Sequence, residues 1–533
     1  MQHKAFDYVV VGGGSAGCAV AARLSEDPGK TVLLLEAGGP ERHLLMKMPL
    51  TFTALRGHPT LEWGYGTDPE PYVNGRIVPA ARGRVLGGSS SVNGMMYSRG
   101  HPRDYDQWRQ LGADGWGWDE VLPYFKKSER SWRGETPTHG ASGQLRVSPL
   151  RSGEPIAKAI RDTARGLRYR VLDDFEAGDP EGFALPDLTV FGGRRASAAT
   201  AFLEPARRRA NLKIVTGAHV TRITLEKGRA TGVEYQAARE ANAVQAGEII
   251  LCGGAYATPQ ILMLSGVGPA EHLRRHGIRP VLDLPGVGSG LQEHPLAPMA
   301  FSLKRPLRFT QGLRADKLAL SGLYWWLTGR GFPAAMPLSS IAYLKSRPDL
   351  ERPDLEHIFM GTNMAAHVWL PGWRPPRPDQ LTVLNVVLRP GSRGSVRLRS
   401  ADPFDKPRIQ FNLLQDPEDL RLMRHAFRWT RDFVRQGELA DHVADEALPG
   451  AALADDAALD AYIRQTVGTA QHPASSCKMG QGPDAVVDAQ LKVRGIEGLR
   501  IADASVMPTL IGGHTNAPSI MIGEKAADMI QAS

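Results

Sequence analysis

Residues 7–36 open with a run of apolar positions that does not alternate with polar ones. The run Tyr8–Val11 is rich in β-branched residues, which is typical of a strand that is covered on both faces. A stretch rich in glycine and alanine follows, and Thr31–Leu35 forms a second apolar run. This pattern predicts a strand, a helix and a parallel strand, the repeating unit of a doubly wound α/β sheet.

The turn after the first strand carries Gly12, Gly14 and Gly17, spaced as G-x-G-x-x-G. The first glycine permits a tight turn, the second lets the backbone approach a pyrophosphate, and the third allows close helix packing. The helix N-terminus adds free N–H groups for phosphate oxygens. Glu36 stands where an acid accepts hydrogen bonds from the ribose of FAD or NAD. With strand, helix and acid in register, a dinucleotide site is favoured over an ordinary glycine-rich turn.

Related patterns recur far along the chain. Residues 247–268 repeat the order of strand, glycine turn and helix, whereas 211–225 alternate like the strands of a hairpin. Leu499–Ala502 predicts a last strand, and the segment APSIMIGEKAADMI predicts a closing helix. We therefore expect a nucleotide-binding domain assembled from the discontinuous segments 1–150, 190–295 and 470–533. Residues 151–189 and 296–469 are expected to form an inserted substrate domain.

A second glycine-serine loop spans residues 83–100, GRVLGGSSSVNGMMYSRG. Its residues are too small and too polar for a core segment. Two adjacent glycines indicate that something bulky lies against the backbone at this point.

Composition narrows the class of protein. The chain has 533 residues, 42% hydrophobic and 23% charged, which are ordinary values for a globular protein. Three cysteines are too few for a disulfide framework and lack metal-ligand spacing, so we expect no metal site and a cytoplasmic location. The net charge of +8 comes without any nucleic-acid-binding module. No signal peptide is visible before the first strand.

The longest strongly apolar stretch is LALSGLYWWLT, residues 318–328, which is too short to span a bilayer. We favour a core helix here over a membrane-facing or entrance segment. The sequence is compatible with peripheral contact with the inner membrane. It does not predict the oligomeric state.

With these segments together, the chain resembles the glucose–methanol–choline (GMC) oxidoreductases over almost its whole length. Residues 83–100 are similar to the first signature of that family, and GAYATPQILMLSGVG (254–268) to the second. Further matches include HPASSCKMG (472–480) and IADASVMP (501–508). Within the family, the chain is most similar to the bacterial branch that is choline-dehydrogenase-like and sorbose-dehydrogenase-like.

The resemblance implies an FAD domain, a substrate domain built on an antiparallel sheet, and oxidation of an alcohol. It places the FAD contacts on the glycine turn, the end of the second strand, the second loop, segment 211–225 and the last strand and helix. These contacts are Gly12, Gly14, Ser15, Gly17, Glu36, Ala37, Arg84, Val85, Gly87, Gly88, Ser89, Asn93, Gly94, Met95, Val220, Asp503, Ala504, Asn516 and Pro518.

Hydride removal from an alcohol carbon requires a base for the hydroxyl proton, and histidine is suited to this near neutral pH. By motif, His472 matches the catalytic histidine of the family, although a histidine before proline can be a simple loop residue. Asn516 matches its partner, and it would equally suit the N-cap of the last helix. We treat His514 as a loop residue and His294 as a structural residue at the domain junction.

One departure from the family bears on the cofactor. Members with a histidyl–flavin bond carry the histidine just before the asparagine of the first signature, where this chain has Val92 before Asn93. Valine cannot form that bond, so we expect noncovalent FAD.

Three functions remain open at this point. The first is an FAD-dependent alcohol dehydrogenase that passes electrons to a quinone or another organic acceptor. The second is an oxidase of similar alcohols that uses oxygen and releases hydrogen peroxide. The third is a member without alcohol oxidation, such as a lyase or a flavoprotein scaffold. A choline-type substrate would require an aromatic cage with a carboxylate, for which Trp325, Trp326, Trp369 and Trp373 are candidates.

Overall fold

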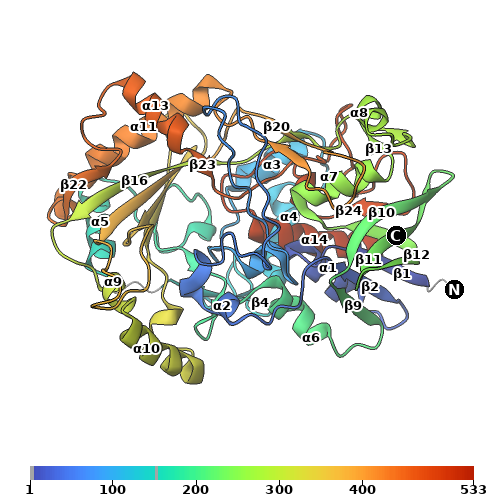
Figure 1. Ribbon diagram of the computed structural model, residues 1–533, viewed down its shortest axis with the longest axis horizontal. Coiled ribbons are helices and arrows are strands. Elements are labelled where there is room, and N and C mark those ends of the chain that lie inside the picture. The colour runs from blue at the N-terminus through green and yellow to red at the C-terminus, as the bar shows by residue number, and fades with distance from the viewer. Residues whose placement is uncertain (1–4, 151–153) are drawn as a thin grey trace.

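The computed structural model describes residues 5–150 and 154–533. Two large sheets, each of seven strands, organise the described part of the chain. One lies on the right of Figure 1 with both termini, and the other lies on the left. The blue segment that follows β2 runs between them, next to α3 (Pro102–Gln110) and α4 (Trp118–Ser128).

The first sheet is built around a buried parallel strand, β1. Its strands run in the order β10-β11-β12-β1-β2-β9, and β24 pairs with β12. β1 is parallel to both of its neighbours, and Val9 and Val10 are completely buried, as the non-alternating run predicts. The bounds are β1 (Ala5–Val11), β2 (Val32–Glu36), β9 (Leu212–Thr216), β10 (His219–Glu226), β11 (Arg229–Ala237), β12 (Glu240–Leu251) and β24 (Leu499–Ile501).

The expected hairpin within residues 211–225 is wrong. β9 lies parallel to β2 at one edge of the sheet, whereas β10 is antiparallel to β11 at the other end of the strand order. The alternating pattern indicated strands correctly. It carried no information about partners, because each strand completes a ladder with a segment other than its sequence neighbour.

The second sheet is antiparallel in every pairing given for it, as the family resemblance implies. Helices α5 (Pro155–Gly166), α11 (Pro417–Val434) and α13 (Asp456–Thr466) share its hydrophobic core. The strands are β5 (Gly182–Ala184), β16 (Pro295–Leu303), β17 (Leu338–Leu344), β18 (Leu355–Met360), β19 (Gln380–Val387), β22 (Val443–Leu448) and β23 (Gly468–Thr469).

Two helices from opposite parts of the chain pack closely beside β1. α1 (Ser15–Leu24) contacts α14 (Asn516–Gln531), and a β-carbon on Gly523 would lie 2.6 Å from the carbonyl oxygen of Ala16. Arg23 donates to both carboxylate oxygens of Glu524, at 2.7 and 2.9 Å. The turn after β1 and the N-terminus of α14 are therefore held against each other.

Shorter elements connect these units. The remaining helices are α2 (Leu44–Lys47), α6 (Glu204–Ala206), α7 (Gly254–Leu264), α8 (Ala270–Arg275), α9 (Arg308–Gly312), α10 (Ala315–Thr328) and α12 (Gly437–Ala440). The remaining strands are β3 (Glu129–Ser131), β4 (Leu145–Pro149), β6 (Asp187–Leu188), β7 (Val190–Phe191), β8 (Arg194–Arg195), β13 (Val267–Gly268), β14 (Leu282–Asp283), β15 (Ser289–Leu291), β20 (Gly394–Arg397) and β21 (Arg408–Gln410).

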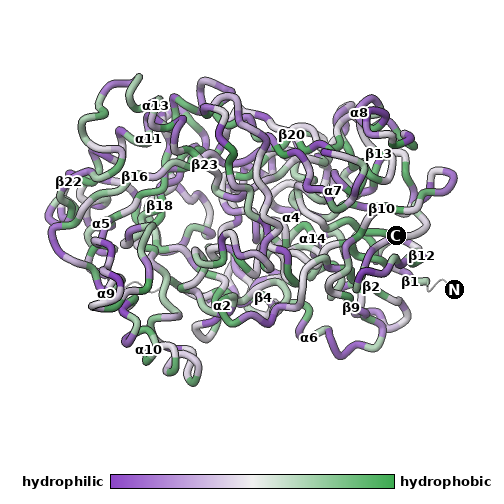
Figure 2. The backbone as a smooth tube through the Cα atoms, viewed as in Figure 1, coloured by the Kyte–Doolittle hydropathy of each residue, from purple (hydrophilic) through white to green (hydrophobic). Residues whose placement is uncertain are grey.

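The apolar stretch 318–328 belongs to α10, and the interpretation as a core helix is wrong. α10 projects from the body at the lower left of Figure 1, and Figure 2 shows its hydrophobic residues in green. Trp325 is its one buried side chain among the described residues, whereas Leu320 and Leu327 are each 73% exposed. None of the described helices is long and apolar enough to cross a membrane.

Candidate active site

A single cavity of about 1280 Å³ reaches from the glycine turn after β1 to the second sheet. It is lined by the β1 turn, the second glycine-serine loop and the N-terminus of α14 at one side. Strands β16 to β19 close the other side. The discontinuous segments predicted to form the nucleotide site therefore meet at one cavity.

The three glycines of the turn have three different roles. Gly12 has a φ of +102°, and a β-carbon on it would lie 2.5 Å from the carbonyl oxygen of Cys252. A β-carbon on Gly17 would lie 2.0 Å from the carbonyl oxygen of Gly12, so this residue sets the close packing of α1 on β1. Gly14 lines the cavity, and the nearest atom to its β-carbon position is 4.0 Å away. A side chain at Gly14 would therefore project into the cavity itself.

The second loop is packed directly on the first. The N–H of Gly87 donates to the carbonyl oxygen of Gly13 at 2.7 Å. Gly88 has a φ of +55°, and a β-carbon there would lie 2.7 Å from the Cα of Gly14. The close neighbour of Gly88 is thus the backbone of the first glycine turn, whereas a β-carbon on Gly87 would meet the side chains of Ser91 and Ala199.

Glu36 ends β2 and lies at the same end of the cavity. Its carboxylate accepts hydrogen bonds from the N–H groups of Gly13 and Gly38, at 2.8 and 2.7 Å. Burial raises the pKa of Glu36 to about 7, and these two hydrogen bonds oppose the shift. Each carboxylate oxygen of Glu36 can accept a further hydrogen bond, so the side chain can bind the hydroxyl groups of a ribose.

Asp503 anchors the loop that follows β24. One carboxylate oxygen accepts from the N–H of Gly254 at 2.8 Å and from the hydroxyl of Thr258 at 2.6 Å, and the other accepts from the N–H of Ser505. Burial raises the pKa of Asp503, whereas these donors lower it. This side chain ties the C-terminal loop to the start of α7 beside the cavity.

Most of the residues expected to contact FAD line this cavity. They are Gly12, Gly14, Ser15, Glu36, Ala37, Arg84, Gly88, Ser89, Asn93, Gly94, Met95, Val220, Asp503, Ala504 and Asn516. Four do not line it, namely Gly17, Val85, Gly87 and Pro518. Gly17 and Gly87 instead shape the packing behind the two turns, and Val85 is buried in a small apolar cluster.

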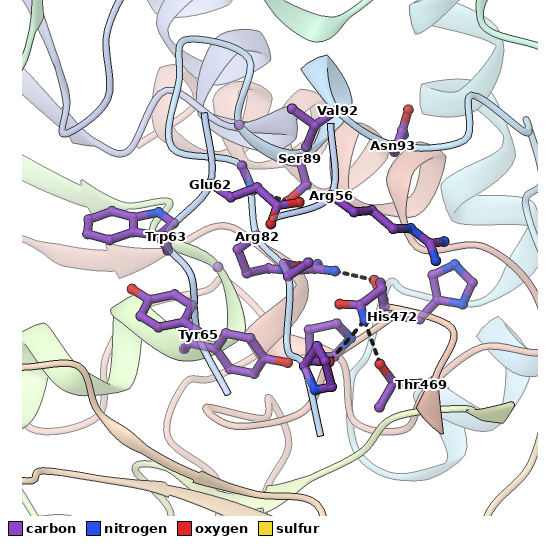
Figure 3. A pocket seen from close by; sticks show the side chains of 18 of the residues that line it. Arg56, Glu62, Trp63, Tyr65, Arg82, Ser89, Val92, Asn93, Thr469 and His472 are labelled. Carbon is purple, nitrogen blue, oxygen red and sulfur yellow. Dashed lines mark hydrogen bonds between the residues drawn. The ribbon is translucent and has the colours of Figure 1, made fainter. Parts of the chain in front are cut away.

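His472 lies at the far side of the cavity in a group of three imidazoles (Figure 3 shows His472 and its neighbours). Its Nδ1 is 3.0 Å from the Nδ1 of His294, and its ring meets the ring of His514 edge-on at a centroid distance of 4.7 Å. Glu293 accepts from the backbone N–H of His472 at 2.7 Å. Glu356 of β18 lies 2.8 Å from the Nε2 of His514.

The surroundings keep His472 neutral. Burial, followed by the neighbouring His514 and His294, holds the pKa of His472 well below 6.5. Burial also lowers the pKa of His294 to about 3. One of the two facing Nδ1 atoms must donate and the other accept. When His472 donates from Nδ1, its Nε2 carries a free lone pair, which is the form that a proton acceptor requires.

Sequence reasoning left His294 and His514 outside the site, whereas the structure brings both into contact with His472. Two signals pointed to His514: it precedes Asn516 by two residues, and Glu356, its partner, is an acid in the mostly apolar strand LEHIFM. Arg56, Glu62 and Arg82 were also missed, and Figure 3 shows them between Val92 and the loop of Thr469 and His472.

The N-cap interpretation of Asn516 is wrong. α14 begins at Asn516 itself, and Thr515 is its N-cap, without a side-chain hydrogen bond. The Oδ1 of Asn516 instead accepts from the hydroxyl of Ser15 at 2.8 Å. Its Nδ2 is then the donor left for a molecule in the cavity, which Asn516 lines.

Comparison with known families decides the class of protein. Two family models described as GMC oxidoreductase match the chain, an N-terminal one over residues 6–296 and a C-terminal one over residues 390–523. The chain belongs to the GMC oxidoreductase family.

Curated relatives of this GMC oxidoreductase match along nearly the whole chain. A protein of Brucella anthropi, named oxygen-dependent choline dehydrogenase, is 39% identical, with 98% of this chain and 95% of the relative covered. A protein of the same name from Rhizobium etli is also 39% identical, with the same coverage.

Solved structures agree with the fold. Pyridoxine 4-oxidase from Mesorbium loti has a TM-score of 0.89 at 32% identity, with 99% of both chains covered. A formate oxidase variant from Aspergillus oryzae has a TM-score of 0.92 at 29% identity, covering 100% of this chain and 99% of the other.

The GMC chain is an FAD enzyme that acts on CH–OH groups, and its cavity fits this cofactor. Gly14 offers a backbone surface without a side chain, and no side chain caps the N-terminus of α1, so its N–H groups can meet a pyrophosphate. Glu36 can receive the ribose hydroxyls. The N-terminus of α14 faces the same cavity and favours negative charge on a bound ring.

Replacing Gly14 by valine should give folded protein that lacks FAD. The new side chain would occupy the cavity where the pyrophosphate meets the backbone, without disturbing the packing behind the turn. The measurement is the ratio of flavin to protein absorbance, together with a thermal unfolding curve.

Gly39→Val is the matched control, because nothing lies within 4 Å of its β-carbon position and it does not line the cavity. It should retain FAD. Wild-type flavin content in Gly14→Val would contradict the assignment of this turn to the pyrophosphate.

Proposed function

We propose that this protein oxidises an alcohol whose non-reacting part is apolar, and that it passes the electrons to a quinone or another organic acceptor. His472 acts as the base, Asn516 as a hydrogen-bond donor, and FAD is bound noncovalently. The observation that carries the proposal is the imidazole of His472, packed against His294 and His514 in the same cavity as an uncharged, mostly aliphatic wall.

The wall that the second sheet turns toward the cavity is uncharged and mostly apolar. Neither an acid nor an aromatic residue occurs among the lining residues that this sheet contributes. Those residues are Leu296, Pro298, Ala300, Leu338, Ile358, Met360, Gln380, Thr382, Leu384, Leu448, Gly468 and Thr469. The four tryptophans considered for an aromatic cage all lie outside the cavity lining. This wall supports burial of an alkyl or neutral aryl group rather than a quaternary ammonium ion.

The protein's own groups would act on the hydroxyl end of the alcohol. The Nε2 of His472 accepts the hydroxyl proton, while its Nδ1–H stays on the Nδ1 of His294. The Nδ2 of Asn516 donates to the substrate oxygen and holds it in place. When bound, FAD supplies the acceptor for the hydride of the alcohol carbon. Val92, which lines the cavity next to Asn93, has no atom that could bond to the flavin.

The second candidate function is an alcohol oxidase, and the names of several structural neighbours support it. Several structural neighbours carry oxidase names, among them pyridoxine 4-oxidase and a fungal aryl-alcohol oxidase. The two candidates share the alcohol half-reaction and differ in the second substrate.

His472→Ala should bind FAD but slow flavin reduction by the alcohol by at least about 10²-fold, because the proton acceptor is lost. In the wild type, the reduction rate should be constant from about pH 6.5 upward. It should fall only at clearly acid pH, since the pKa of His472 is lowered. Stopped-flow absorbance of the flavin measures both.

Asn516→Ala is the companion variant. It should slow reduction by a smaller factor, because it removes a donor and leaves the base in place. Near-wild-type reduction in His472→Ala at neutral pH would leave the base unidentified and refute the assignment.

Straight-chain primary alcohols should reduce the flavin with an apparent Kd that falls about fourfold for each added methylene, until the cavity is filled. This factor follows from about 0.8 kcal/mol for each buried methylene. Choline and sugars should be poor substrates. A preference for choline over alkanols of similar size would refute the apolar substrate class while leaving the role of His472 intact.

Turnover with quinone or phenazine dyes should exceed turnover with oxygen. The reduced enzyme, mixed separately with each acceptor, gives the two reoxidation rates directly. Hydrogen peroxide formed in stoichiometric amounts at a comparable rate in air would establish the oxidase instead.

A further inference from the structure

α10 and the loop beside it expose an unusual amount of apolar surface, which we call the α10 surface. Its residues are between 37% and 73% exposed. They are Leu320, Leu323, Tyr324, Trp326 and Leu327 of α10, together with Met364, Val368, Leu370 and Trp373 of the loop that follows β18.

Backbone contacts join the helix and the loop into one unit. The N–H of Ala315 donates to the carbonyl oxygen of Trp369 at 2.8 Å, and the N–H of Trp369 donates to the carbonyl oxygen of Leu313. On the opposite side, the buried Trp325 donates from Nε1 to the carbonyl oxygen of Gly193 at 2.8 Å. The exposed side chains are therefore presented by an anchored helix rather than by a loose end.

Basic residues are frequent in the chain segments that carry and adjoin this apolar surface. Residues 304–330 contain six basic side chains, Lys304, Arg305, Arg308, Arg314, Lys317 and Arg330, against one acid, Asp316. Arg314 pairs with Asp316, so this acid and this base neutralise each other and five basic side chains remain. Arg374 and Arg377 add exposed positive charge beside Trp373. These segments are thus complementary to a negatively charged partner.

We propose that the α10 surface docks on an anionic lipid bilayer, with α10 lying in the plane of the interface. A helix of 14 residues is too short to span a bilayer and long enough to lie on one. Leucine, tryptophan and tyrosine next to lysine and arginine are the composition that such an interface favours. A second copy of the chain fits less well, because twofold pairing would bring the two sets of basic residues together.

The docked surface borders the cavity. Met364 and Ala365 line the cavity, and the same loop carries Val368 and Trp373 on the α10 surface. Docking would therefore place this wall of the cavity at the lipid interface. The proposal does not depend on the identity of the alcohol or the electron acceptor.

Vesicle co-sedimentation of the full-length, FAD-loaded protein tests the proposal. Vesicles of phosphatidylcholine with phosphatidylglycerol should bind the protein, and vesicles of phosphatidylcholine alone should bind it at least about tenfold more weakly. The triple variant Leu320→Ser, Leu323→Ser and Leu327→Ser should lose at least about tenfold in binding to the anionic vesicles. Lys317→Glu with Arg330→Glu should weaken the same binding.

A matched control replaces three exposed apolar residues outside the surface, Ile77, Leu111 and Val281, by serine, and should bind like the wild type. Flavin absorbance and the thermal unfolding curve verify that each variant is folded. Failure of the wild type to bind anionic vesicles at low salt would overturn the proposal, as would wild-type binding by the α10 triple variant. Sedimentation velocity that shows a wild-type dimer and a monomeric triple variant would assign the surface to a second copy instead.

Discussion

The cavity depends on a place where three stretches of backbone meet without any β-carbon between them. Gly12 lies against the carbonyl of Cys252, Gly17 against Gly12, and Gly88 against Gly14. A methyl group at any of these three contacts would sit within 2.0 to 2.7 Å of backbone atoms, which the fold cannot absorb by moving a side chain. The meeting point fixes the end of β1, the start of α1 and the second loop relative to one another, and every group at the nucleotide end of the cavity takes its position from it.

At the other end of the cavity, the arrangement of three histidines determines whether His472 carries a positive charge. The buried imidazole of His294 and the partly buried imidazole of His472 face each other through their Nδ1 atoms. The ring of His514 lies beside His472, with the buried carboxylate of Glu356 behind it. Desolvation and the neighbouring rings of His514 and His294 disfavour a positive charge on His472. They lower its pKa, so the neutral imidazole is favoured. The strands of the second sheet contribute no charged side chain to the cavity lining. The polar groups therefore concentrate on one small region, where an alcohol would present its hydroxyl.

Local patterns allowed sequence-based prediction of one half of this site and not of the other. The glycine turn, α1, β2 and Glu36 lie within thirty consecutive residues, so spacing alone could predict their arrangement. The pairing of His514 with Glu356 joins residues 158 positions apart, and no local pattern encodes it. The cap of α14 was misplaced by one residue, which was enough to change the partner of Asn516 from the helix backbone to Ser15. For α10, hydrophobicity was interpreted as burial, although the same residues suit an interface.

The pairing of α1 with α14 also has a consequence for the order in which the fold can assemble during synthesis. Arg23 and Glu524 are 501 positions apart, and the strands beside β1 are β2, which follows it closely, and β12, from the middle of the chain. Contacts of such long range form slowly, and here they cannot form until the C-terminal helix has left the ribosome. The antiparallel sheet has its residues between 182 and 469, so it can assemble before the nucleotide end is complete. The nucleotide end of the cavity therefore depends on contacts between the first and the last of the described segments, whereas the antiparallel sheet uses only residues between them.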